Sequence, residues 1–190
     1  MSENLLHVAI IIGSTREGRF GPTVADWFTG QAAQRSDISF DVIDLEDASL
    51  PSIMGTSTAH GLGDVTGRLD AAEAFVVVTP EYNHSYPASL KNLIDWHFTQ
   101  WQAKPVGFVS YGGLAGGLRA VEHLRPVFAE LHAVTIRDTV SFHNPWSQFD
   151  EDGRHQDSTA ADAAAKNMLD QLAWWGHALR DAKAVRPYAA

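Results

Sequence analysis

The chain of 190 residues contains no cysteine. Disulfide bonds and thiolate metal sites are therefore excluded, and the cytoplasm, a reducing compartment, is the expected location. No apolar run approaches the roughly 20 residues that a membrane-spanning helix needs. The first residues show neither the basic segment nor the cleavage pattern of a signal peptide. We therefore expect no contact with a membrane.

Basic residues are scarce as well. The chain has 14 Lys and Arg against 23 Asp and Glu, a formal net charge of −9. Nucleic-acid-binding surfaces need clustered Lys and Arg, so we expect no nucleic-acid partner. The 9 histidines include no tight ligand motif such as H-E-x-x-H, and no metal site is predicted. Repeats, low-complexity tracts and linkers are also lacking, and residues 1–190 are interpreted as a single domain.

Apolar strand-like runs alternate with amphipathic helical segments along the chain. Strands are predicted at 5–12, 38–45, 74–79, 104–113 and 133–142, and helices from Pro22 and at 65–73, 87–98, 117–131 and 158–182. This alternation implies a parallel sheet with helices on both faces. Five strands favour the α/β class, as a flavodoxin-like three-layer α/β/α sandwich with strand order 2-1-3-4-5. A Rossmann fold fits less well, because GSTREG lacks the G-x-G-x-x-G spacing.

Three chemically rich loops follow the first, third and fourth predicted strands. They read GSTREGRFG (13–21), PEYNHSYP (80–87) and SYGGLAGG (110–117). In a 2-1-3-4-5 sheet these loops meet beyond the carboxyl ends of the strands, where ligands bind. Each loop taken alone is also consistent with an ordinary turn carrying solvated side chains. Their combination at one edge is what predicts a binding site.

The composition of the loops indicates the kind of ligand. The first loop offers backbone N–H groups, hydroxyls and two arginines at the start of a helix, which favours a phosphate. It lacks the G-x-x-x-x-G-K-[ST] pattern, so a P-loop nucleotide triphosphatase is not indicated. The third loop has two glycine pairs that allow close backbone approach to a flat group. The second adds amide and aromatic groups, and the three together predict a planar ligand with a phosphate tail.

The same three stretches resemble a known family. GSTREGR, PEYNHSYPASLKNLIDW and SYGGLAGGLRAVEHLRPVFAEL are similar to segments of the NADPH-dependent FMN reductase family, flavodoxin-like flavoproteins that include quinone, chromate and azo reductases. The resemblance spans roughly residues 5–140, and PEYN-x-S-x-P-x-x-L-K-N-x-I-D-W is its most specific element. It implies bound FMN, NADPH or NADH as hydride donor, and a small-molecule electron acceptor such as a quinone or free flavin. Turnover is expected to be ping-pong, with hydride passing to the flavin and then to the acceptor.

The resemblance also implies which residues bind FMN. The phosphate is assigned to Ser14, Thr15, Arg16, Arg19 and the backbone near Phe20. The isoalloxazine is assigned to Pro80, Glu81, Tyr82 and Asn83, mostly through backbone atoms, and its pyrimidine side to Ser110, Tyr111, Gly112 and Gly113. His84 is expected to contact the substrate. No catalytic side chain is assigned, because the flavin carries the chemistry.

Relatives of this kind are dimers or tetramers, which implies a homodimer or homotetramer here. The segment from Pro87 to Trp101 carries Trp96, Phe98 and Trp101, and we expect it to form the subunit interface. Two other functions on the same scaffold stay open from the sequence: a flavodoxin-type electron carrier, and an FMN-binding regulatory module without turnover. A flavin-free enzyme acting on a phosphate-bearing ligand is a third.

Overall fold

The computed structural model describes residues 5–55 and 62–189. Its five strands are β1 (Leu6–Ile12), β2 (Ile38–Asp44), β3 (Ala74–Pro80), β4 (Pro105–Gly112) and β5 (Val134–His143). All neighbouring strands are parallel, in the order β2-β1-β3-β4-β5. The predicted flavodoxin-like topology is therefore confirmed. The sequence between the second predicted strand and the following helix, residues 46–64, has no clear period and is typical of a long loop; its residues 56–61 lie outside the described residues.

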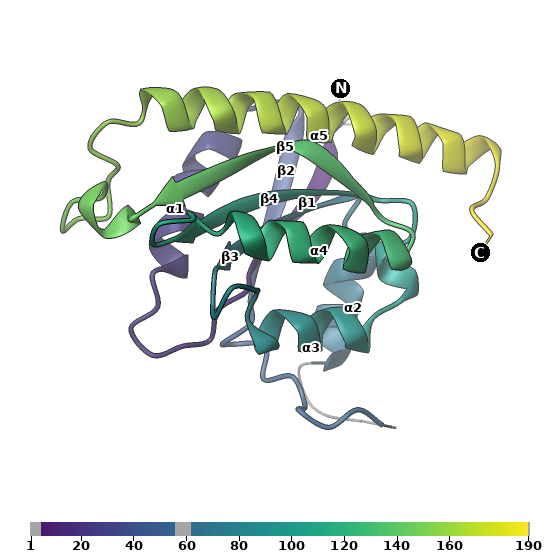
Figure 1. Cartoon of the computed structure of the whole chain (residues 1–190). Coiled ribbons are helices and arrows are strands. Elements are labelled where there is room, and N and C mark those ends of the chain that lie inside the picture. The colour runs from purple at the N-terminus through teal and green to yellow at the C-terminus, as the bar shows by residue number, and fades with distance from the viewer. Residues whose placement is uncertain (1–4, 56–61, 190) are drawn as a thin grey trace.

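Helices cover both faces of the sheet, as Figure 1 shows. They are α1 (Gly21–Ala32), α2 (Leu62–Ala71), α3 (Ala88–Trp96), α4 (Leu118–Glu130) and α5 (Thr159–Val185), with short 3₁₀ turns η1 (Thr99–Trp101) and η2 (Pro145–Ser147). Helices α1 and α5 pack on one face, and α2, α3 and α4 on the other. No helix in the described ranges is long and apolar enough to cross a membrane.

The sequence of each strand matches its place in the sheet. The central strand β3 reads AFVVVTP and is buried at every position, because helices cover both of its faces. The edge strand β2 is only partly buried, which agrees with its alternating apolar and polar residues. Strand β4 is also buried throughout, and its side chains alternate between the two faces. Val109 and Tyr111 point toward α1 and α5, whereas Val106 and Phe108 point toward α4.

The segment expected at a subunit interface differs from the prediction. Helix α3 ends at Trp96, His97 is extended, and Trp101 is completely buried with its ring 4.7 Å from Phe75. The Trp96 indole N–H donates to the Pro51 carbonyl at 2.9 Å. The assignment of Trp101 to an interface is therefore wrong, because the break after α3 turns its ring into the core. Trp96 is partly exposed, and its place at an interface stays a prediction.

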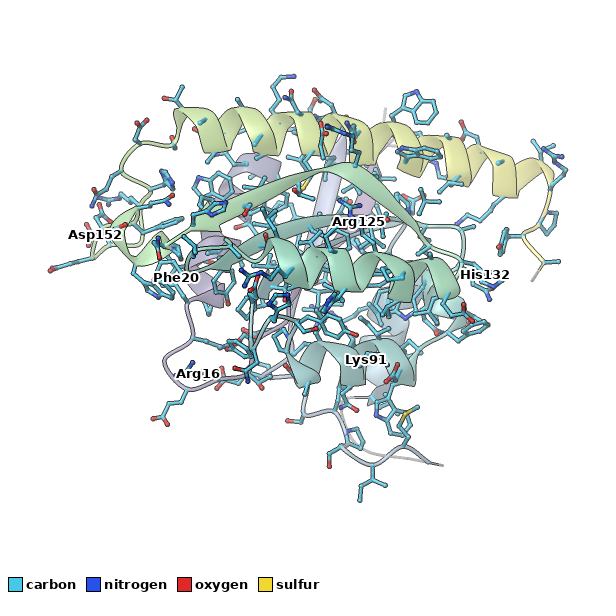
Figure 2. The ribbon with its side chains drawn as sticks, in the orientation of Figure 1. Arg16, Phe20, Lys91, Arg125, His132 and Asp152 are labelled. Atoms are coloured by element: carbon cyan, nitrogen blue, oxygen red, sulfur yellow. The ribbon has the colours of Figure 1, made fainter. Side chains whose placement is uncertain are left out.

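An arginine from a neighbouring helix lies against each edge strand. Arg125 of α4, labelled in Figure 2, donates to the carbonyls of Ile136 at 2.9 Å and Arg137 at 3.2 Å. These carbonyls belong to an irregular stretch of β5 where the register with β4 shifts. At the opposite edge, Arg68 of α2 donates to the Val42 carbonyl of β2 at 2.5 Å. Backbone carbonyls of both edge strands thus have side-chain partners at these positions.

Candidate functional site

The three loops predicted to form a site do meet at one edge of the sheet. They enclose a cavity of about 320 Å³, within the range of small-molecule pockets. Its lining consists of Arg16, Glu17, Gly18, Arg19, Phe20, Pro80, Glu81, Tyr82, Tyr111, Gly112, Gly113 and Trp146. In Figure 2 Arg16 and Phe20 lie at the end of the sheet where β5 finishes, with Asp152, and His132 lies at the other end. The cavity therefore occupies the carboxyl edge of the sheet.

The first loop carries an anion-binding geometry. Helix α1 begins at Gly21 with a proline in its first turn, and no side chain caps it. The first N–H groups of a helix lack partners inside the helix and carry partial positive charge. The exposed Arg16 lies in the same loop and forms no ion pair with any residue in 5–55 or 62–189. An uncapped helix start beside an unpaired guanidinium fits a phosphate group.

Arg19 has a different environment from Arg16. Its guanidinium pairs with Asp44 at 2.5 Å and with Glu46 at 2.5 Å, and it also donates to the Ser14 carbonyl at 2.8 Å. The hydrogen bond to Asp44 is the largest cause of a raised pKa for Arg19. Arg19 lines the cavity, but its guanidinium is already occupied by these contacts. They attach the first loop to the end of β2. Its contact with a phosphate stays a prediction.

The second loop forms a tight turn with free backbone N–H groups. Tyr82 and Ser85 exchange hydrogen bonds, Tyr82 N–H to the Ser85 carbonyl at 2.8 Å and the reverse at 3.0 Å. Asn83 and His84 between them have φ values of 48° and 72°, the sign pattern of a type I′ turn. Their own N–H groups bond to no other described residue. The turn thus presents two amide donors to solvent.

Side chains of the second loop point to different places. Glu81 is mostly buried and pairs with Arg119 of α4 at 2.7 Å, which fixes the loop to that helix. The Tyr82 hydroxyl is 2.6 Å from the Ser14 hydroxyl, so this ring reaches back to the first loop. The His84 ring lies 6.2 Å from the His123 ring on α4 and is not part of the cavity lining. The expected substrate contact of His84 stays a prediction.

The third loop depends on glycine. Gly117 has φ 83°, and a Cβ there would lie 2.7 Å from the Ser110 Cβ. The Ser110 hydroxyl donates to the Gly116 carbonyl at 2.8 Å and is completely buried. Ser110 therefore holds the loop in shape and is absent from the lining, while Gly112 and Gly113 form part of the cavity wall.

The Tyr111 side chain does not point along the third loop, where the sequence predicts contact with the pyrimidine side of the flavin. It is only 4% exposed and points toward α1 instead. A Cβ on Gly21 would lie 3.0 Å from its hydroxyl oxygen. The hydroxyl has no hydrogen-bond partner among the described residues.

Other predicted residues lie close to the cavity without lining it, and some lining residues were missed. Ser14, Thr15, Asn83 and Ser110 are outside the lining, whereas Glu17, Gly18 and Trp146 are inside it. Trp146 sits in η2 after β5, is 61% exposed, and has its ring 6.4 Å from that of Phe20. Glu17 and Gly18 lie within the quoted first loop, but no sequence pattern marks the loop after β5.

Two larger hollows are lined by arginines that already have acidic partners. One, about 550 Å³, contains Arg35, which pairs with Asp37. The other, about 750 Å³, lies along β5 between α4 and α5. The arginines that line it pair with acidic neighbours in the same hollow, Arg125 with Glu122 and Arg137 with Asp138. Over the described ranges, no group of three or more acidic or histidine side chains could hold a metal ion. The carboxyl edge is therefore the candidate site.

Comparison with known proteins identifies the family. The model of the family described as NADPH-dependent FMN reductase matches residues 6–147. An NAD(P)H-dependent FMN reductase of Schizosaccharomyces pombe is 35% identical over 119 residues, covering 58% of this chain and 60% of that protein. A quinone reductase of Escherichia coli is 34% identical over 146 residues, covering 72% of this chain and 76% of that protein.

A solved structure supports the fold. The flavoenzyme NAD(P)H:(acceptor) oxidoreductase FerB from Paracoccus denitrificans superimposes with a TM-score of 0.73 at 22% identity, over 91% of this chain and 98% of that one. At this identity the likeness concerns the fold alone. The family match over most of the chain and the identity to the quinone reductase show that this chain belongs to the NADPH-dependent FMN reductase family, a family of FMN- and NAD(P)H-dependent oxidoreductases.

Proposed function

We propose that the protein is an FMN-dependent NAD(P)H oxidoreductase that delivers electrons to a quinone, free flavin or similar small acceptor. The observation that carries the proposal is the cavity at the carboxyl edge, with the unpaired Arg16 and the uncapped α1 at one end. The free N–H groups of Asn83 and His84 and the bare backbone of Gly112 and Gly113 lie on the loops around it. FMN, when bound, supplies hydride transfer between donor and acceptor.

Each part of the site has a proposed role. Arg16 and the first N–H groups of α1 hold the phosphate, because a guanidinium gives forked hydrogen bonds to phosphate oxygens. The free amides of the turn at Asn83 would donate to the polar edge of the ring system. Gly112 and Gly113 allow the backbone to approach the ring because they lack a Cβ. Phe20 and Trp146 add aromatic cover at the cavity wall.

The arrangement also supports ping-pong turnover. The three loops enclose one cavity, so donor and acceptor use the same opening in turn. The acceptor contacts a surface of aromatic and backbone groups, which suits a flat, partly apolar molecule such as a quinone. No side-chain nucleophile or metal is needed for this chemistry.

The direct test is an absorbance spectrum of the purified protein with FMN, followed by NADPH under nitrogen. We expect a flavin band that bleaches with NADPH or NADH and returns when a quinone is added. A protein that does not retain FMN would refute the proposal. A flavin that binds but does not bleach would instead indicate an electron carrier or a regulatory module.

Assembly and location belong to the same proposal. We expect a homodimer or homotetramer from the family resemblance, although only Phe98 of the three aromatic residues first assigned to an interface remains substantially exposed, at 51%. Light scattering after size-exclusion chromatography measures this directly, and a strictly monomeric protein would contradict it. A cysteine-free chain is compatible with the reducing cytoplasm, where fractionation of the source cells should find the protein.

A further inference from the structure

The Tyr111 hydroxyl is a buried donor without an acceptor. The residue is only 4% exposed, and its hydroxyl bonds to no residue that the structure describes. Leaving a buried hydroxyl unpaired costs free energy, so such a group in a folded protein calls for an explanation. The residue also lines the cavity of the candidate site, which indicates a ligand as the missing partner.

The residues around this hydroxyl come from the first loop and the start of α1. Strand alternation puts Tyr111 on the same face as Val109, toward α1. The hydroxyl lies against Gly21, the first residue of α1, where a Cβ would come within 3.0 Å of it. The nearby Ser14 hydroxyl is already bonded to Tyr82 at 2.6 Å.

A phosphate group would supply what this hydroxyl lacks. The oxygens of a phosphate dianion accept hydrogen bonds, and the uncapped start of α1 favours an anion at the same place. A buried donor, a helix N-terminus and Arg16 therefore line the same cavity. For Tyr111 to contact the pyrimidine edge of the flavin instead, its side chain would have to leave the α1 face of the sheet, on which it is packed.

We propose that the Tyr111 hydroxyl donates a hydrogen bond to the FMN phosphate, and that Tyr111 is a phosphate-binding residue and not a residue flanking the pyrimidine ring. The inference rests on the proposed function. It predicts that Tyr111 contributes to the discrimination between FMN and riboflavin, which lacks the phosphate.

The electrostatics of Tyr111 are compatible with this role. Burial raises the pKa of the hydroxyl, and Tyr82 acts in the same direction. The nearby Ser14 hydroxyl opposes the shift by a polar interaction, but it does not reach hydrogen-bond geometry with Tyr111, and its own bond goes to Tyr82. A phenol with the ordinary pKa of about 10 is already protonated, and hence a donor, at neutral pH, and the upward shift extends this to more alkaline pH. A phenolate would repel a phosphate instead.

The test compares two ligands and two variants. In Tyr111→Phe, we expect the dissociation constant for FMN to rise about tenfold or more, the scale of one hydrogen bond to a charged group. Riboflavin affinity should stay within about twofold, since that ligand has no phosphate to lose. The melting temperature without ligand should not fall, because the hydroxyl has no partner to lose. Tyr86→Phe, outside the cavity lining, is the matched control and should change none of these values.

Several results would overturn the inference. One is unchanged FMN affinity in Tyr111→Phe, and another is an equal loss of FMN and riboflavin affinity. A lower melting temperature without ligand would show a structural role for the hydroxyl. If the variant does not fold, a crystal structure of the wild-type protein with FMN decides: a phosphate oxygen within about 3 Å of the hydroxyl supports the inference, and a larger separation refutes it. A wild-type protein that binds neither flavin would instead refute the proposed function.

Discussion

Arg16 and Arg19 stand three positions apart in one loop, and we predict opposite consequences for their removal. Arg16 is exposed and forms no ion pair with a described residue, whereas the Arg19 side chain is 11% exposed and pairs with Asp44 and Glu46. Arg16→Ala should therefore weaken FMN binding without affecting the fold. Arg19→Ala should destabilise the fold first.

The contacts set the size of both effects. A hydrogen bond to a charged group contributes about 1.5–3 kcal/mol, so Arg16→Ala should raise the dissociation constant for FMN roughly 10- to 150-fold. Arg19→Ala removes the partner of Asp44, whose side chain is only 17% exposed. We expect it to lower the free energy of unfolding by about 1–3 kcal/mol, less than for a fully buried pair.

Two assays separate the variants. Flavin fluorescence titration with FMN and with riboflavin measures binding, and urea denaturation of the ligand-free protein measures stability. Arg16→Ala should retain wild-type stability and riboflavin affinity, and its FMN defect should shrink at high salt, because screening weakens the exposed wild-type charge. Wild-type FMN affinity in Arg16→Ala would refute the phosphate assignment. An equal loss of affinity for FMN and riboflavin would show that Arg16 contacts the flavin ring and not the phosphate.

Three further predictions concern the supporting structure. Burial lowers the pKa of Lys104 from 10.5 to about 8, so the folded state releases its proton before the unfolded state does. The unfolding free energy should then rise between pH 8 and pH 10.5, by roughly 3 kcal/mol from this residue. Denaturation curves of Lys104→Met across this pH range should lack that rise. An identical pH dependence in the variant and the wild type would contradict the lowered pKa of Lys104. His84→Gly should raise stability by about 0.5–1 kcal/mol by releasing its positive φ, and a drop in melting temperature would argue against that strain. Gly117→Ala should cost at least about 2 kcal/mol in stability and also reduce FMN affinity, because its Cβ would strike Ser110; a variant with wild-type stability and binding would show that the loop adapts.

The fold was predictable because its signals are local. The run AFVVV is apolar throughout and lies in the fully buried β3, and the alternating segment at 38–45 forms the edge strand β2. The end of α3 was not predictable in the same way. Trp101 leaves the helical segment because Phe75 and Phe128 offer it a pocket in the core, and those residues are distant in sequence.

In the site, too, local sequence predicted some features, whereas others depend on residues distant in the chain. The family motifs located the three loops, and most of the residues assigned from them line the cavity. The sequence could not show which of the two arginines is unpaired, because the partner of Arg19 is Asp44, 25 positions along the chain. The direction of Tyr111 was readable in principle, since period-two alternation from Val109 puts it on the α1 face of β4.

The arginines at the two outermost strands have a consequence for solubility. An unprotected strand edge is a template on which another chain can add a strand and begin a fibre. Arg125 occupies two carbonyls of such a template on β5, and Arg68 occupies one on β2. Each guanidinium is also held by an acidic neighbour, Arg125 by Glu122 and Arg68 by Asp41, which keeps it at its strand. This pair of guanidinium groups therefore acts against self-association through continuous sheets, a protection that does not depend on any ligand.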